Sequence, residues 1–296
     1  MPVIWTVLLL ALLLAALGFY LAAYSVGGER QTLEDARAWQ SQRYDISWYD
    51  RIEKKDYTVE SFDGYVLHVQ RLVNEKASGR YIILSHGYTD NRIGSLKYAQ
   101  MYLDLGFQVI LYDLRGHGEN EPTFCTYSVR ERKDLAALIA DTRKRYPDLT
   151  LLGLHGESLG SATSVAVLDG KPPVDFMVAD CGFSEIESVM RTGLCRMHLP
   201  GCLVHVASLC TKLRYGCSYR EMRPIDSLKN NEVPILFIHG AQDDFIPPSH
   251  SQAMADATKG YSEVHLIKGA AHAQSMLTAP EEYRKIVRDF LSAQVG

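Results

Sequence analysis

Residues 149–163 constrain the fold of this chain more than any other stretch. They begin with a short apolar run of strand length and continue, beyond Leu159, into a pattern typical of a helix. Between the two lies Gly-Glu-Ser-Leu-Gly, in which Gly156 and Gly160 flank Ser158. A strand that turns sharply into a helix strains its corner residue and crowds the residues two positions away, where glycine has no Cβ to collide. The pattern predicts a nucleophile elbow, a turn that exposes the Ser158 hydroxyl at the end of a strand.

Apolar runs of strand length alternate with helical patterns over most of the chain. Strands are expected at residues 81–85, 108–112, 149–154, 176–179, 234–239 and 263–267. Helices are expected at residues 95–105, 129–146, 159–168, 251–258 and 280–291. A hairpin precedes this series, because residues 57–61 and 65–71 alternate around Asp63-Gly64. The order predicts an α/β fold, a mostly parallel, doubly wound sheet with an antiparallel N-terminal edge.

Residues 184–231 interrupt the alternation of strands and helices. They carry little strand pattern and fall between two expected strands of the sheet. We interpret them as a helical lid over the mouth of the sheet, where ligands of such folds bind.

Five of the six cysteines lie in or next to this lid, but none forms a C-x-x-C pair. Spacings of seven, eight and seven residues from Cys195 to Cys217 favour free thiols buried on the apolar faces of helices. Disulfides and a metal site are the alternatives, and we expect no metal. The five are Cys181, Cys195, Cys202, Cys210 and Cys217.

The N-terminus is a long uncharged segment. Residues 2–28 contain no charged side chain, and at 1.5 Å per residue a helix of this length crosses a hydrocarbon core of about 30 Å. The segment has no basic leader, and its apolar run exceeds the roughly 7–15 residues of a signal peptide. These features favour an uncleaved single-span membrane anchor. A signal peptide cleaved near Ala22-Ala23 and a buried helix are the alternatives.

Charge and length set the remaining limits. A net charge of −4 without a basic stripe gives no indication of nucleic-acid binding. The 296 residues are expected to divide into the anchor or signal at 1–28, a packing linker at 29–56 and a catalytic domain at 57–296. A count of the Lys and Arg residues that flank the span favours a cytoplasmic domain. Because anchors with short tails often translocate their large domain, we expect the extracytoplasmic side.

A serine nucleophile needs a general base, and the base needs an acid that orients it. His272 follows the last expected strand in a loop of small residues, which makes it the best base. His239 and His265 lie within or at the end of strands, where packing or hydrogen bonding is the expected role. Three acids follow strands in suitable positions, and the residues alone leave the choice among them open. They are Asp180, Asp243 and Asp244.

Acyl transfer also needs donors for the oxyanion. The backbone N–H of Leu159, directly after the serine, is one candidate. The second is expected after the strand at 81–85, where Gly87 allows the backbone to turn so that the Tyr88 N–H faces the pocket. His86 is expected to shape this loop by hydrogen bonding.

Five motifs then occur in a familiar order: HGYTDNR, YDLRGHG, HGESLGSAT, HGAQDDFIP and GAAH. From about residue 57 to the end, the chain resembles the α/β-hydrolase family, and most closely its membrane-anchored bacterial serine-aminopeptidase-like members. The resemblance implies Ser158 as nucleophile, His272 as base, and Tyr88 with Leu159 as oxyanion donors. It implies Asp243 as the acid, because that residue follows Gly240 by three positions. No cofactor is implied.

These features predict a serine hydrolase that cleaves a carboxylic ester, a thioester or an amide through an acyl-enzyme. An esterase or lipase is the first expectation, and a serine aminopeptidase or acyl-protein thioesterase is the alternative. The lid is expected to select the acyl or peptide substrate. A catalytically silent binding protein that keeps the fold is the alternative outside enzymes.

Overall fold

The computed structural model of the protein describes residues 2–296, and within them eight strands form a single sheet in the order β1-β2-β4-β3-β5-β6-β7-β8. The pairs β1–β2 and β2–β4 are antiparallel and the other five pairs are parallel, so the predicted antiparallel edge and mostly parallel sheet are confirmed. The strands are β1 (Lys54–Glu60), β2 (Val66–Leu72), β3 (Arg80–Ser85), β4 (Gln108–Tyr112), β5 (Leu151–Glu157), β6 (Phe176–Asp180), β7 (Ile235–Gly240) and β8 (Ser262–Ile267).

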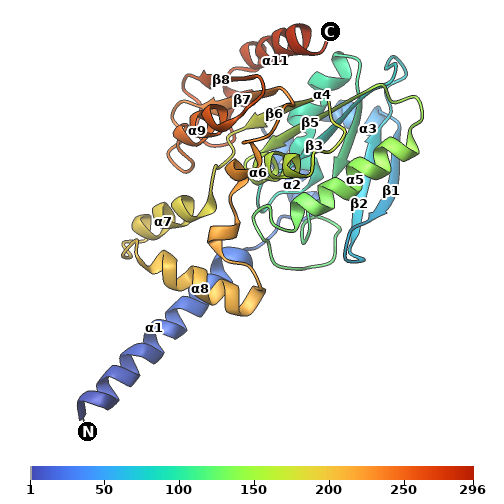
Figure 1. Ribbon diagram of the computed structural model, residues 1–296. Helices are drawn as coiled ribbons and strands as arrows, with labels where there is room; N and C mark the ends of the chain where they lie inside the picture. The colour runs from blue at the N-terminus through green and yellow to red at the C-terminus, as the bar shows by residue number, and fades with distance from the viewer. Residues whose placement is uncertain (1) are drawn as a thin grey trace.

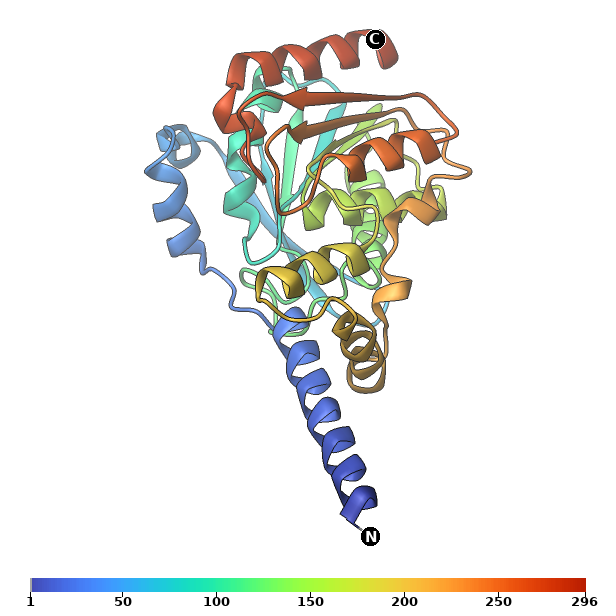
Figure 2. The same ribbon diagram turned by 90° about the vertical axis from the view of Figure 1, so that its left-hand side faces the viewer.

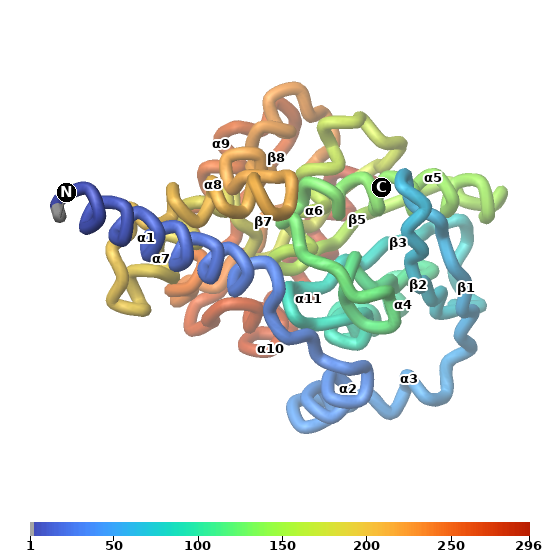
Figure 3. Tube along the Cα trace, turned by 90° about the horizontal axis from the view of Figure 1, so that it is seen from below, coloured from blue at the N-terminus to red at the C-terminus, as the bar shows by residue number. Residues whose placement is uncertain are grey.

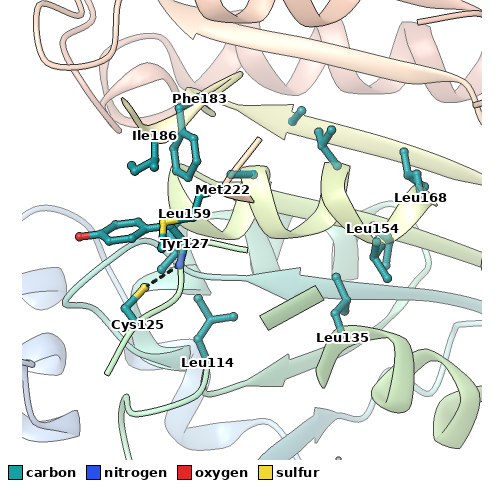
Figure 4. Close-up of a cluster of buried hydrophobic side chains, with 14 of the residues drawn as sticks. Leu114, Cys125, Tyr127, Leu135, Leu154, Leu159, Leu168, Phe183, Ile186 and Met222 are labelled. Atoms are coloured by element: carbon teal, nitrogen blue, oxygen red, sulfur yellow. Dashed lines mark hydrogen bonds between the residues drawn. The ribbon is translucent and has the colours of Figure 1, made fainter. Parts of the chain in front are cut away.

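Helices cover both faces of the sheet, as the buried apolar side chains form two clusters. One cluster joins the sheet to α5 (Glu131–Arg145), α6 (Leu159–Ala166) and α9 (Ser249–Ala257), and Figure 4 shows part of it. The other joins it to α4 (Leu96–Asp104), α10 (Ser275–Thr278) and α11 (Pro280–Gln294). Two short helices of the expected linker, α2 (Leu33–Ser41) and α3 (Ser47–Arg51), also pack against this second cluster.

The segment between β6 and β7 is helical, as the lid prediction required. It contains α7 (Ile186–Arg196), α8 (Leu203–Tyr215) and the short 3₁₀ helices at Tyr219–Glu221 and Pro224–Ser227. No disulfide joins cysteines within the described residues. Cys181, Cys210 and Cys217 are buried, but Cys195 and Cys202 are exposed, so the prediction of buried thiols is wrong for these two. Cys195 lies in the last turn of α7 and Cys202 directly precedes α8, on either side of the turn that joins the two helices.

The helix α1 (Pro2–Val26) projects from the side of the molecule that carries the lid (Figures 1 and 2). By length and composition Val3–Val26 can cross a membrane, and its outer part is exposed, so the alternative of a helix buried in the protein is wrong. Its inner end packs beside α8, a contact also visible from below in Figure 3. A Cβ on Gly18 would lie 2.7 Å from both Val206 Cγ1 and Cys210 Sγ, so this glycine allows the close approach. The domain limits at residues 28 and 56 stay a prediction.

Candidate active site

The turn between β5 and α6 holds Ser158 in a strained conformation. Its φ of 53° lies in the left-handed region, which is costly for a residue with a side chain. A Cβ on Gly156 would lie 2.3 Å from the Gly160 carbonyl oxygen, and one on Gly160 would lie 2.0 Å from that of Ser85. Any residue other than glycine at these two positions would force the turn apart. The local geometry therefore agrees with the predicted elbow.

Three side chains from separate loops form a hydrogen-bonded chain. Ser158 Oγ lies 2.9 Å from His272 Nε2, and His272 Nδ1 lies 2.7 Å from Asp243 Oδ2. Ser158 directly precedes α6, Asp243 follows β7 and His272 follows β8. Because β5, β7 and β8 are parallel, their carboxyl ends lie at one edge of the sheet, and this edge brings the three residues together.

Asp243 is held by four groups. Its Oδ1 accepts hydrogen bonds from the backbone N–H of Phe245, at 3.0 Å, and of Ile246, at 2.9 Å. Its Oδ2 faces His272 and also lies 3.2 Å from His239 Nε2. Burial alone would raise the pKa of Asp243. The hydrogen bonds from His239 and His272, together with the charge interaction with His272, hold that pKa well below its ordinary value. The carboxylate is therefore ionised at neutral pH.

His239 is a supporting residue whose contacts the sequence did not specify. Its Nε2 lies 2.7 Å from the Ile246 carbonyl oxygen, which is only an acceptor, so Nε2 carries the proton. Its Nδ1 then accepts from Ser251 Oγ at 2.7 Å. The imidazole thereby fixes the loop that carries Asp243.

The two alternative acids lie elsewhere. Asp244 is 87% exposed in its side chain and pairs with Arg196 of the lid at 3.2 Å. Asp180 is buried behind the elbow, where its Oδ2 accepts the Tyr98 hydroxyl at 3.0 Å. Of the three acids considered, only Asp243 contacts His272.

The expected oxyanion donors are free to bind a ligand. Among residues 2–296, neither the Tyr88 N–H nor the Leu159 N–H donates to another protein atom. A Cβ on Gly87 would lie 3.6 Å from Ser158 Cβ, so the loop that carries Tyr88 passes beside the nucleophile. His86 shapes this loop, because its Nδ1 lies 2.8 Å from the Gly87 carbonyl oxygen and its Nε2 accepts the Leu114 N–H at 2.9 Å.

The end of α1 and the residues that follow it hold the loop that carries Tyr88 in place, a contact that the sequence did not indicate. The Gly28 N–H donates to the Tyr88 hydroxyl at 3.1 Å, and that hydroxyl donates to the Ser25 carbonyl oxygen at 3.0 Å. The guanidinium of Arg30 lies 4.5 Å from the centre of the Tyr88 ring. The N–H of the next residue, Gln31, donates to the carbonyl oxygen of Thr89 at 2.8 Å. The segment after α1 therefore positions a predicted oxyanion donor.

A pocket of about 600 Å³ opens beside Ser158, and most of its lining side chains are apolar. Tyr127, Phe183 and Ile186 line the pocket, and they lie near Leu159 in the core (Figure 4). The charged residues in its lining are Glu29 and Arg196. The volume falls within the range of about 300–1,000 Å³ that is usual for small-molecule sites.

A buried polar cluster supports the elbow from behind. Lys97 forms an ion pair with Glu157, the residue before the nucleophile, and its Nζ also donates to the Ala273 carbonyl oxygen at 3.1 Å. Burial, with a further contribution from the charge of Glu157, raises the pKa of Asp180 to about 6. The cluster joins the ends of β5 and β6 to α4 and to the loop that carries His272.

One group of side chains within the described residues has the composition of a metal site. The potential ligand atoms of Cys181, Asp243 and His272 lie within 4.8 Å of one another. The 2.7 Å hydrogen bond between Asp243 and His272 occupies two of these atoms, so hydrogen bonding accounts for their arrangement without an ion.

This fold, with a strained serine, a histidine and an acid at the ends of β5, β8 and β7, defines an α/β-hydrolase. The chain belongs to the prolyl oligopeptidase family, whose sequence model matches residues 95–296. The narrower resemblance to serine-aminopeptidase-like hydrolases stays a prediction.

Known proteins of three kinds are similar to this chain. "Uncharacterized protein YqkD" of Bacillus subtilis is 31% identical over 247 residues, which cover 82% of this chain and 81% of that protein. Esterase Pf2001 of Pyrococcus furiosus has a TM-score of 0.70 at 23% identity, over 86% of this chain and 97% of its own. An acylaminoacyl peptidase of Pyrococcus horikoshii has a TM-score of 0.64 at 17% identity, over 82% of this chain and 42% of its own.

Proposed function

We propose that this protein is a membrane-anchored serine hydrolase that cleaves a carboxylic ester through an acyl-enzyme. The observation that carries the proposal is the hydrogen-bonded chain from Ser158 Oγ to His272, at 2.9 Å, and from His272 to Asp243, at 2.7 Å. This is the arrangement that makes a serine hydroxyl nucleophilic at neutral pH.

The reaction has two halves. Ser158 Oγ attacks the acyl carbon while His272 Nε2 takes its proton, and the resulting oxyanion accepts hydrogen bonds from the Tyr88 and Leu159 N–H groups. The bond to the leaving oxygen then breaks, and His272 gives its proton to the departing alcohol. Water, deprotonated by His272, attacks the acyl-enzyme. The bond between the acyl carbon and Ser158 Oγ then breaks, and His272 returns its proton to Ser158 Oγ as the carboxylic acid leaves. Asp243 holds the imidazole in the required tautomer throughout.

An ester is the first choice of substrate because the pocket beside Ser158 is mainly apolar. The similarity to an esterase of the same fold agrees with this choice. Peptidase activity is the second candidate, because Glu29 is one of the residues that line the pocket, and a carboxylate binds a free amino group. Faster release of nitroaniline from aminoacyl nitroanilides than of nitrophenol from acyl esters would favour the peptidase.

We infer that α1 stays attached as a membrane anchor. Its outer residues are exposed and apolar, and such a surface is stable only in a lipid environment. Its inner end is built into the folded protein, because Leu21, Ala22 and Val26 are buried. A signal peptide that is removed has no use for such packing. The extracytoplasmic side is the proposed location of the catalytic domain.

Labelling with a fluorophosphonate probe tests the chemistry. The full-length protein in detergent should react at Ser158, and Ser158→Ala should abolish both labelling and hydrolysis of an acetyl ester. Ser161→Ala is the matched control, because Ser161 lies one turn away on α6, is buried and makes no hydrogen bond through Oγ within the described residues. Labelling that persists in Ser158→Ala, or an unlabelled wild-type protein, would refute the assignment.

A further inference from the structure

We propose that the inner end of α1 forms one wall of the substrate pocket, and that this pocket holds the aliphatic acyl chain of an ester that resides in the bilayer. The inference rests on the proposed function, because it needs Ser158 as the nucleophile. It deepens that function by naming a substrate class and by giving the membrane segment a part in recognition.

Residues from two remote parts of the chain line the same pocket. Leu21, Tyr24 and Ser25 come from α1, whereas Ile186 and Met190 come from the lid helix α7. Two of the α1 residues are fixed in place, since Leu21 is only 5% exposed and the Ser25 hydroxyl lies 2.6 Å from the Tyr219 hydroxyl of the lid. The pocket is therefore complete only when α1 is present.

The chemistry of the lining favours an aliphatic chain. Glu29 and Arg196 are the charged residues of the lining, and Arg196 is already paired with Asp244 at 3.2 Å. The amide groups of a peptide would lose their hydrogen bonds to water in such a pocket, whereas each methylene of an acyl chain gains from burial. A volume of about 600 Å³ leaves room for a chain well beyond an acetyl group.

The surface of the lid places this pocket at the membrane. On α8, Leu209 and Leu213 are 61% and 68% exposed. Val206 of α8 packs against Gly18 of α1. Leu209 and Leu213 lie three and seven residues after Val206, so all three residues share one face of α8. These exposed apolar residues and those of α1 lie on two helices that pack together, and both helices lie on the lid side of the molecule (Figure 2). An ester in the bilayer would therefore reach the pocket by lateral movement along α1 and α8.

Substitutions at Leu21 test the wall. The readout is the ratio of kcat/KM for a dodecanoyl nitrophenyl ester to kcat/KM for the acetyl ester, measured with full-length protein in detergent. Leu21→Trp fills the pocket and should lower this ratio about tenfold or more, because each methylene that no longer fits costs about fourfold. Leu21→Ala enlarges the pocket and should shift the preferred chain to a greater length, so a folding failure of the Trp variant does not remove the test.

Leu14→Trp is the matched control. Leu14 lies seven residues before Leu21 on the same helix, is 44% exposed and does not line the pocket. It should keep the wild-type ratio. Unchanged ratios in both Leu21 variants would overturn the acyl-pocket proposal even if Ser158 reacts with the fluorophosphonate. A wild-type enzyme without Ser158-dependent activity would instead refute the proposed function itself.

An assay in vesicles tests whether the ester substrate comes from the bilayer. Protein reconstituted into phosphatidylcholine vesicles should hydrolyse a fluorogenic palmitoyl ester in the same membrane at least tenfold faster than the same ester in separate vesicles. Equal rates in the two arrangements would show that the ester arrives through water, and would overturn the bilayer source.

Discussion

Replacing Asp243 by Asn tests the triad through the tautomer of His272. Oδ1 of Asp243 accepts two backbone N–H groups, at 3.0 and 2.9 Å, and only an oxygen can do so. The carboxamide oxygen of the introduced asparagine must therefore take the place of Oδ1, which leaves its NH₂ group in the place of Oδ2. That position lies 2.7 Å from His272 Nδ1 in the wild-type protein. The NH₂ group can only donate there, so the proton of the imidazole moves to Nε2.

The magnitude follows from this tautomer. With a proton on Nε2, His272 can no longer accept the proton of the Ser158 hydroxyl, which lies 2.9 Å away. An Asn in the acid position of such a triad lowers kcat by about 10⁴, equivalent to roughly 5.5 kcal/mol of transition-state stabilisation. A purely electrostatic role, without the tautomer, would cost far less.

The assay is steady-state hydrolysis of an acetyl ester together with the rate constant of fluorophosphonate labelling, at neutral pH. Asp244→Asn is the control, since it removes the neighbouring carboxylate, which is exposed and does not contact His272. Asp244→Asn should stay near the wild-type rate while Asp243→Asn falls by about 10⁴ in both measurements. A loss of less than tenfold in Asp243→Asn would refute the orientation role of this residue.

Two further predictions concern stability and location. The folded-state pKa of Asp180, about 6, lies above the ordinary 3.8, so the folded state binds this proton more tightly and stability falls as pH rises between these values. Asp180→Asn should remove that slope and raise the free energy of unfolding at pH 7 by up to about 3 kcal/mol in urea titrations, and lower stability would contradict this. Cys195 and Cys202 are exposed, so a membrane-impermeant maleimide should label intact cells if the domain is extracytoplasmic. Labelling only after lysis, with a Cys195→Ser/Cys202→Ser variant as the blank, would place the domain in the cytoplasm.

The fold, and the proximity of three side chains at the site, could be predicted from the sequence because both depend on local patterns. The strand at Gln108–Tyr112 has the bounds that its apolar run predicted, and β5, β7 and β8 are each followed by a turn that carries one residue of the hydrogen-bonded chain. The order of strands then places Ser158, Asp243 and His272 at one edge of the sheet. The choice among three acids was not local, and only the spacing shared with a known family favoured Asp243.

Features that depend on contacts between remote segments could not be predicted. The ion pair of Lys97 with Glu157 joins side chains 60 residues apart in the sequence, and neither residue has a neighbour pattern that indicates it. The exposure of Cys195 and Cys202 also depends on where α7 ends. The spacing of the cysteines does not indicate how the turn at Pro200-Gly201 orients the helices on either side of it. The hydrogen bonds of His239 could not be predicted for the same reason, because they depend on how separate segments pack.

The α1 helix shows most clearly why an apolar segment should not be regarded as an anchor alone. Composition predicts that residues 3–26 can span a bilayer, and any apolar sequence of that length would do so. The close approach of Gly18 to Cys210 and the 2.6 Å hydrogen bond between the Ser25 and Tyr219 hydroxyls are specific, because each needs one residue type at one position, and Leu21 is buried as well. An anchor needs none of them. Specific packing at the inner end of a helix whose outer apolar side chains are exposed is the pattern expected of a segment that both holds the enzyme at the bilayer and completes its substrate pocket.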